Sequence, residues 1–258
     1  MTRRLRNITR LALLLIAVSV MGNAVMYLLG NSPFNLGDLS VERTVGAELA
    51  DQIRIETETE KMEVIPIKGD EIRAVLRGKT TKKWLEDYRI DIVEDQGSIR
   101  IKVIQDSRFR FFDFYTDLKL TVGIPEKKLS RLQVVSDTGD ISIDSVSADI
   151  YSAASDTGSI RLDIQEGEIQ ARTDTGTIAA SLHHIAHDIH AETDSGDITI
   201  QTALIPRALR TKLSAGSGKT DVSLPNYRDG GIGEGGPWME LVSDTGNLIV
   251  KQSNELQK

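Results

Sequence analysis

Hydrophobic and polar residues alternate in short segments along the second half of the chain. These segments flank a recurring tripeptide, Asp-Thr-Gly or a variant of it. They read VVSDTGDISI, AASDTGSIRL, ARTDTGTIAA, AETDSGDITI, LSAGSGKTDV and LVSDTGNLIV. Alternation with a period of two is typical of a strand with one buried face. Each segment therefore predicts a strand, a tight turn and a second strand.

The repeated unit predicts the fold class. Its turn glycines are Gly139, Gly158, Gly176, Gly196, Gly218 and Gly246, spaced by 19, 18, 20, 22 and 28 residues. A single unit cannot bury its apolar face alone, so neighbouring units must stack. We expect an all-β stacked repeat, a β-solenoid or parallel β-helix-like fold. A β-sandwich of hairpins is the alternative, because Asp-Thr-Gly can also close a hairpin. The residues around Gly97 resemble an upstream copy.

The tripeptide has a structural and a catalytic interpretation. Glycine adopts positive φ without steric cost, and the aspartate can accept a hydrogen bond from a backbone N–H two residues on. Asp-Thr-Gly is also the aspartic-protease signature, which needs two carboxylates that share a proton. Five copies at repeat spacing favour structural turns. The unit around Gly218 lacks the aspartate.

The N-terminus predicts where the chain resides. Residues 11–29 are uncharged and long enough to span a bilayer of roughly 30 Å. Arginines precede this run, and positive flanks tend to stay in the cytoplasm. We expect a single-pass signal anchor in the cell membrane, with the N-terminus cytoplasmic and the C-terminal domain extracytoplasmic. Secretion after signal cleavage near residues 22–24 is the alternative.

The expected organisation follows from these two features. It comprises a basic cytoplasmic tail (1–10), the transmembrane anchor (11–29), a linker (30–44), an N-terminal β region (45–125), the Asp-Thr-Gly repeat region (126–252) and a short tail (253–258).

Composition narrows the function classes. The chain has no cysteine and a net charge of −7, although its first ten residues carry four arginines. An acidic ectodomain would repel phosphates, so we expect no nucleic-acid partner. The absence of cysteine excludes thiolate metal sites and a cysteine nucleophile.

The repeats, with the strand LKLTVGIP leading into them, resemble the bacterial putative-adhesin domain family of unknown function. The size and the N-terminal anchor are similar to its LiaG-like membrane-anchored members from Gram-positive bacteria. The resemblance covers roughly residues 45–252. It implies an all-β repeat fold at the cell envelope and an association with envelope-stress response systems. It implies no catalytic or cofactor-binding residues.

Two sets of side chains are candidate metal ligands. The turn aspartates could stack along one edge and bind Ca²⁺, which would relieve their repulsion, and clustered histidines suit transition metals. Solvated turns and an exposed strand face are the simpler interpretations, so we expect no metal or cofactor. The candidates are Asp137, Asp156, Asp174, Asp194, Asp244, His187 and His190.

Two segments that break the repeat are candidate contact surfaces, because such loops often carry function. The first is the aromatic run RFRFFDFY, and the second is the glycine-rich segment at 226–238. Local core packing and a tolerated insertion are the alternatives. The residues concerned are Phe109, Phe111, Phe112, Phe114, Tyr115 and Trp238.

The combined expectation is a non-enzymatic protein. It would act as an adhesin-like scaffold or binding module at the cell envelope. Its helix would contact the lipid bilayer. Its other partners would be envelope or membrane proteins of a stress-response system. The alternative is a polysaccharide-acting β-helix enzyme, which would need carboxylates converging on one groove.

Overall fold

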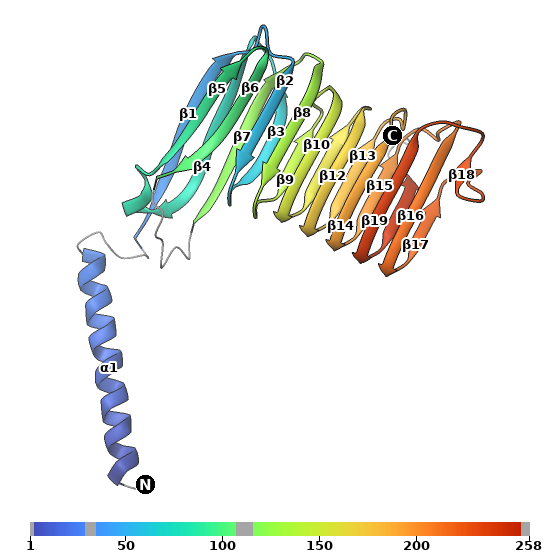
Figure 1. Ribbon diagram of the computed structural model, residues 1–258. Coiled ribbons are helices and arrows are strands. Elements are labelled where there is room, and N and C mark those ends of the chain that lie inside the picture. Colours follow the sequence, from blue (N-terminus) through green and yellow to red (C-terminus); the bar gives the residue numbers. More distant parts are fainter. Residues whose placement is uncertain (1–2, 29–34, 107–115, 254–258) are drawn as a thin grey trace.

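A computed structural model describes residues 3–28, 35–106 and 116–253 (Figure 1). One apolar helix, α1 (Arg3–Leu28), precedes an elongated β domain. Residues 6–28 of α1 are long and apolar enough to cross a membrane, by length and composition. The expected all-β fold with one N-terminal helix is thereby confirmed.

The β domain is a stack of flattened coils. In each coil a strand of one sheet leads through a tight turn into a strand of a second sheet. The coils are β2 (Gln52–Thr57) with β3 (Lys61–Ile67), β8 (Leu129–Ser136) with β9 (Ile141–Asp144), β10 (Ala148–Thr157) with β11 (Ile160–Ile164), β12 (Glu168–Thr175) with β13 (Ile178–Leu182), β14 (Ile189–Ser195) with β15 (Ile198–Thr202), β16 (Leu209–Ser217) with β17 (Thr220–Ser223), and β19 (Trp238–Thr245) with β20 (Leu248–Gln252).

Successive coils pair in parallel and in register. Ile160 lies opposite Ile178 in one sheet, and Ala153 lies opposite Ala171 in the other. Parallel pairing cannot arise from consecutive hairpins, so the stacked repeat holds and the sandwich of hairpins does not. The edge with the Asp-Thr-Gly turns is called the turn edge (137–140, 156–159, 174–177, 194–197 and 244–247). The opposite edge is called the connector edge.

The order of coils in space departs from their order in the chain. Sheet A runs β1-β4-β7-β3-β9-β11-β13-β15-β20-β17, and sheet B runs β18-β16-β19-β14-β12-β10-β8-β2-β6-β5. The last coil in sequence, β19–β20, therefore lies between β14–β15 and β16–β17. The chain reaches the end of the stack first and then returns through β18 (Gly231–Ile232) to fill the gap.

The N-terminal end of the stack is built differently. It is formed by β1 (Leu36–Gly46), β4 (Glu71–Thr81), the 3₁₀ turn η1 (Lys82–Trp84), β5 (Tyr88–Asp95), β6 (Ser98–Gln105) and β7 (Asp117–Pro125). The first strand, β1, begins at Leu36, within the range expected as a linker. Its backbone pairs antiparallel with β4 from Leu36 to Gly46, so these residues are part of sheet A.

The segment around Gly97 is a hairpin and not a further coil. Strands β5 and β6 pair antiparallel around it, so the interpretation as an upstream repeat was wrong. Alternation alone cannot distinguish the two, because hairpins and coils share it. The coil that does precede the repeats is β2–β3, which carries Glu58-Thr59-Glu60 where later coils have Asp-Thr-Gly.

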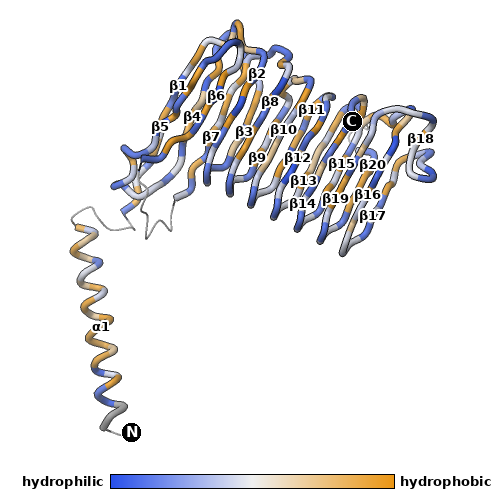
Figure 2. The backbone as a smooth tube through the Cα atoms, in the orientation of Figure 1, coloured by the Kyte–Doolittle hydropathy of each residue, from blue (hydrophilic) through white to orange (hydrophobic). Residues whose placement is uncertain are grey.

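Hydrophobic and hydrophilic residues alternate along the strands of both sheets (Figure 2). The inward positions carry Ile, Leu, Val and Ala and are almost completely buried. Tyr151 is the largest of these buried side chains, and its hydroxyl donates to the carbonyl of Val146. Burial raises the pKa of Tyr151 to about 12, so this hydroxyl stays protonated and structural.

Candidate functional site

The turn glycines are required by the stacking itself. A Cβ built on Gly196 would lie 2.0 Å from the carbonyl oxygen of Gly176. The other turns repeat this contact in stack order, with distances of 1.9 to 2.4 Å. Each turn therefore rests on the peptide of its neighbour, and no other residue leaves room for that approach. The structure places all six expected glycines at such turns: Gly139, Gly158, Gly176, Gly196, Gly218 and Gly246.

The residue before each aspartate holds neighbouring turns together. The hydroxyl of Thr193 donates to the carbonyl of Gly176 at 3.1 Å, and that of Thr173 donates to Gly158 at 3.0 Å. The same bond recurs from Ser155 and Ser243. All four residues are buried. This hydroxyl ladder was missed from the sequence, although its signal is the Ser or Thr that precedes each complete Asp-Thr-Gly or Asp-Ser-Gly.

The turn aspartates do not make the expected turn hydrogen bond. Within the described residues, the side chains of Asp137, Asp156, Asp174, Asp194 and Asp244 accept no hydrogen bond from a backbone N–H. They are exposed along the turn edge, and Asp174 lies 3.7 Å from Arg172. The carboxylates that do bridge coils follow the glycine. Asp140 accepts from the N–H of Ser159 at 2.9 Å, and Asp197 from that of Asn247 at 2.7 Å.

The candidate metal ligands do not converge. In the described part of the chain, no three His, Asp or Glu side chains are placed to hold an ion. His187 is exposed, whereas His183 and His184 border a small cavity of about 260 Å³ at the connector edge. His190 lies on the outer face of sheet B, 3.8 Å from Glu192 and 3.7 Å from Glu240.

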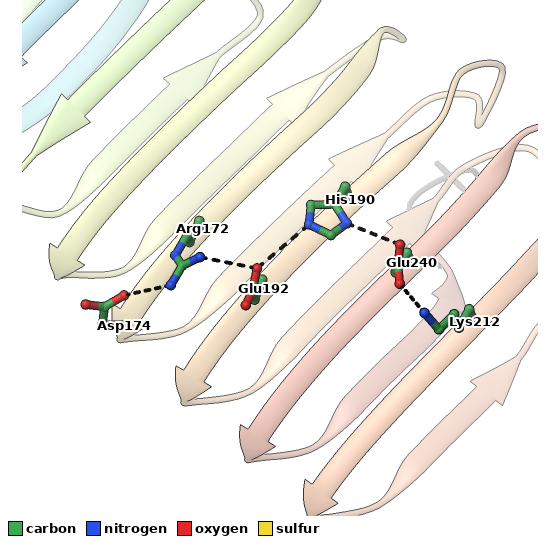
Figure 3. A network of polar contacts seen from close by, with 6 residues as sticks. All are labelled: Arg172, Asp174, His190, Glu192, Lys212 and Glu240. Atoms are coloured by element: carbon green, nitrogen blue, oxygen red, sulfur yellow. Dashed lines mark hydrogen bonds and ion pairs between the residues drawn. The ribbon is translucent and has the colours of Figure 1, made fainter.

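His190 belongs to a chain of polar contacts that crosses four strands (Figure 3). Parallel, in-register pairing brings equivalent outward positions side by side. Arg172 reaches Glu192 at 3.5 Å, and Lys212 reaches Glu240 at 2.7 Å. The bond to Lys212 lowers the pKa of Glu240. Because these groups are partly exposed to solvent, the network stabilises the sheet face weakly.

The glycine-rich segment covers part of the terminal coil. Its strand β18 pairs with Leu209 and Arg210 of β16, and the hydroxyl of Tyr227 lies 2.7 Å from that of Thr211. The guanidinium of Arg210 stacks 5.5 Å from the ring of Trp238, which is half-buried. The segment thus packs as a partial cap. The aromatic run with Phe109, Phe111, Phe112, Phe114 and Tyr115 lies outside the described residues.

A cleft lies at the connector edge of the N-terminal end. It has a volume of about 1000 Å³ and is formed by three turns distant in sequence, 44–50, 67–73 and 94–99. Five exposed carboxylates line it, against two cationic side chains. Arg73 is partly neutralised by Glu42 at 3.2 Å. Within the described residues the five carboxylates have no ion-pair partner. They belong to Glu48, Asp70, Glu71, Glu94 and Asp95.

A fixed loop forms the lip of this cleft. The ammonium of Lys127 donates to the carbonyls of Ala47 and Ala50, which ties the loop to the start of the repeats. Between them Leu49 is 89% exposed, more than any other large apolar side chain of the β domain. An apolar side chain held beside unpaired carboxylates can contact the apolar part of a cationic ligand.

Comparisons with known proteins agree with this architecture. Residues 128–232 match the family model Toastrack DUF4097. Over this part of the chain, the sequence is thus similar to the Toastrack DUF4097 family. The match spans four complete Asp-Thr-Gly or Asp-Ser-Gly turns, the degenerate turn at Gly218 and the loop to β18. No curated protein sequence matches the chain.

Solved structures with a similar fold share little sequence with this chain. A putative cell adhesion protein from Clostridium sporogenes is 10% identical with a TM-score of 0.51, and the match covers 84% of this chain and 100% of that one. A putative adhesin from Bacteroides fragilis is 14% identical with a TM-score of 0.47, covering 83% and 97%. The first likeness supports the fold.

Proposed function

We propose that this chain is a membrane-anchored, non-enzymatic binding module whose N-terminal cleft takes a cationic peptide segment. The observation that carries the proposal is the cleft itself. Five carboxylates that have no ion-pair partner in the described part of the chain line a volume of about 1000 Å³ beside the exposed Leu49. An opposite charge on a ligand would relieve their mutual repulsion. We place the protein at the bacterial cell envelope, and the family resemblance alone adds a link to envelope-stress proteins.

The anchor sets the position of the cleft. Residues 29–35 join α1 to Leu36, and so short a segment spans at most about 28 Å. Leu36 lies at the turn edge, because it pairs with Thr81 and the neighbouring Thr80 contacts Thr116 at the start of β7. The 11 residues of β1 then rise by about 36 Å to the cleft. The cleft therefore lies one strand length beyond the anchored edge, accessible to a ligand from outside the membrane.

Calorimetric titration of the full chain in uncharged detergent micelles tests the proposal. The probe is a peptide of alternating lysine and leucine, and its counterpart carries glutamate instead of lysine. We expect binding of the lysine peptide only, weakened as salt rises, since exposed charges are screened. The variant Asp70→Asn/Glu71→Gln/Asp95→Asn removes three carboxylates. At about 0.2–1 kcal/mol for each exposed pair, affinity should fall roughly 3- to 150-fold.

A matched control separates the cleft from the net charge. The variant Asp137→Asn/Asp156→Asn/Asp194→Asn removes the same charge from the turn edge, and none of these three residues lines the cleft. It should bind the peptide as tightly as the unmodified chain does. Equal losses in both triple variants would mean that attraction is non-specific, and the cleft would then not be the binding site.

A further inference from the structure

The two ends of the stack are finished in different ways. At the N-terminal end the outermost strands β1 and β5 pack against each other, which closes the space between the sheets. At the other end the outermost strands are β16 and β17. Among the described residues, only the short β18 pairs with the outer side of β16, at Leu209 and Arg210. Beyond Thr211, whose N–H donates to Gly230, no described strand pairs with the outer side of that coil.

The backbone of this terminal coil points unpaired groups outward. The N–H of Thr211 donates to Gly230, on the side away from β19, whereas that of Arg210 donates to Pro237. The hydrogen-bonding direction of the backbone alternates along a strand. The backbone N–H and C=O groups of Leu213 and Ala215 therefore also point away from β19. In β17 the carbonyl of Lys219 accepts from Leu248 of β20. By the same alternation, the backbone N–H and C=O groups of Thr220 and Val222 point away from β20.

The core is also incompletely covered here. Leu213 and Val222 are only half-buried, although Leu241 and Val250, their equivalents one coil inward, are completely buried. The end therefore presents two open strand edges and a strip of apolar side chains between them. Such edges are templates for pairing with another chain.

We propose that this end docks on the same end of a second copy, with β16 of each chain pairing antiparallel to β17 of the other. A second copy presents two edges at the same separation, so both sheets continue together. The axis relating the copies runs along the strands. This arrangement places the turn edges of both copies on the same side of the dimer, so both anchors can enter one membrane. The choice of this orientation rests on the membrane anchoring proposed above.

Charge selects the same pairing. The charged side chains of β16 are Arg210 and Lys212, and that of β17 is Asp221. Pairing β16 with β17 joins a strand that carries two cations to a strand that carries an anion, whereas pairing β16 with its own copy joins two cationic strands. Because the N-terminal ends are closed, the contact forms a dimer and does not propagate into a filament.

Cysteine crosslinking of the full chain in membranes tests this geometry, because the chain has no cysteine of its own. Ser214 and Ser223 lie on the outer faces of β16 and β17. Two differently tagged copies, one with Ser214→Cys and one with Ser223→Cys, are treated with a short bismaleimide. We expect a crosslink between the two tags and none when either variant is present alone.

The control pair Ser152→Cys and Ser181→Cys lies on the same two faces in the middle of the stack, and it should not crosslink. Absence of the Ser214–Ser223 crosslink, or crosslinking of Ser214→Cys with itself, would overturn the proposal. Fractionation of the same membranes reports anchoring separately. Crosslinking retained in detergent without membrane association would overturn the anchor but not the dimer.

A blocking variant, added to the Ser214→Cys and Ser223→Cys copies, tests the strand edge itself. Ala215→Pro removes an N–H that faces outward, and proline is tolerated at an edge strand. The crosslink should fall several-fold while the melting temperature is kept. Should that variant fail to fold, Val222→Lys serves instead, because it puts a charge on the half-buried strip. A crosslink undiminished in a folded variant would contradict edge pairing.

Discussion

Replacing Gly196 by alanine should destabilise the stack severely. The new Cβ would lie 2.0 Å from the carbonyl oxygen and 2.6 Å from the carbonyl carbon of Gly176. Both atoms are backbone, so neither can rotate away. Coils β12–β13 and β14–β15 must separate at the turn, although they are paired over the full lengths of β13 and β15.

The expected loss in the free energy of unfolding is the sum of the contacts that the separation weakens. Overpacking of a closely packed site costs about 1–3 kcal/mol. Moving the turn also lengthens the bond from Thr193 to Gly176 and the backbone bond from Gly176 to Ser195, each worth about 1 kcal/mol. We expect a total of about 3–5 kcal/mol. For a domain of this size, that lowers the melting temperature by roughly 6–20 °C.

Thermal unfolding of the full chain in detergent, followed by circular dichroism, measures this effect. The matched control is Gly46→Ala at the end of β1, where nothing lies within 4 Å of the added Cβ and φ is not positive. It should melt within a few degrees of the unmodified chain, because alanine meets no neighbour there. If the two variants melted alike, stacking would not explain the turn glycine.

Two further predictions concern the same turns. Thr193→Val keeps the shape of the side chain but removes the hydroxyl that donates to Gly176. Chemical denaturation should therefore show a loss of about 0.5–1.5 kcal/mol in the free energy of unfolding. An unchanged denaturation midpoint would mean that the hydroxyl ladder does not stabilise the stack. Burial raises the pKa of Glu60 above its ordinary 4.5, so its contribution to stability is present at low pH and is lost as pH rises through the raised pKa. Glu60→Gln should therefore raise the melting temperature at pH 7 and change it little below pH 4.5; a melting temperature at pH 7 equal to that of the unmodified chain would contradict this reasoning.

The sequence predicts the repeated coils well because their signal is periodic. Alternating apolar residues on both sides of Gly158 or Gly176 specify two strands and a turn. The same alternation around Gly97 misleads, because a hairpin and a coil differ only in which strands pair. That choice depends on β2 and β8 occupying the places beside β6 and β10, which no local pattern encodes.

The candidate cleft was not foreseen for a similar reason. Its walls come from three turns at 44–50, 67–73 and 94–99, each of which looks like an ordinary polar turn. Only the antiparallel strands of the N-terminal end bring the three together. A usable signal would have been the acidic pairs at Asp70-Glu71 and Glu94-Asp95, each within two residues of a glycine. Their convergence requires the tertiary fold.

The terminal coil β16–β17 shows that the glycine, the aspartate and the hydroxyl of the repeated motif do not always occur together. It keeps Gly218, whose added Cβ would lie 1.9 Å from the carbonyl oxygen of Gly246. It replaces the aspartate by Gly216 and the ladder hydroxyl by Ala215. The opposite end keeps the hydroxyl, as Thr57, but carries Glu60 in place of the glycine. Glycine thus persists where a neighbouring turn peptide would meet its side chain, so steric contact between coils, and not turn conformation alone, dictates the glycine of this repeat.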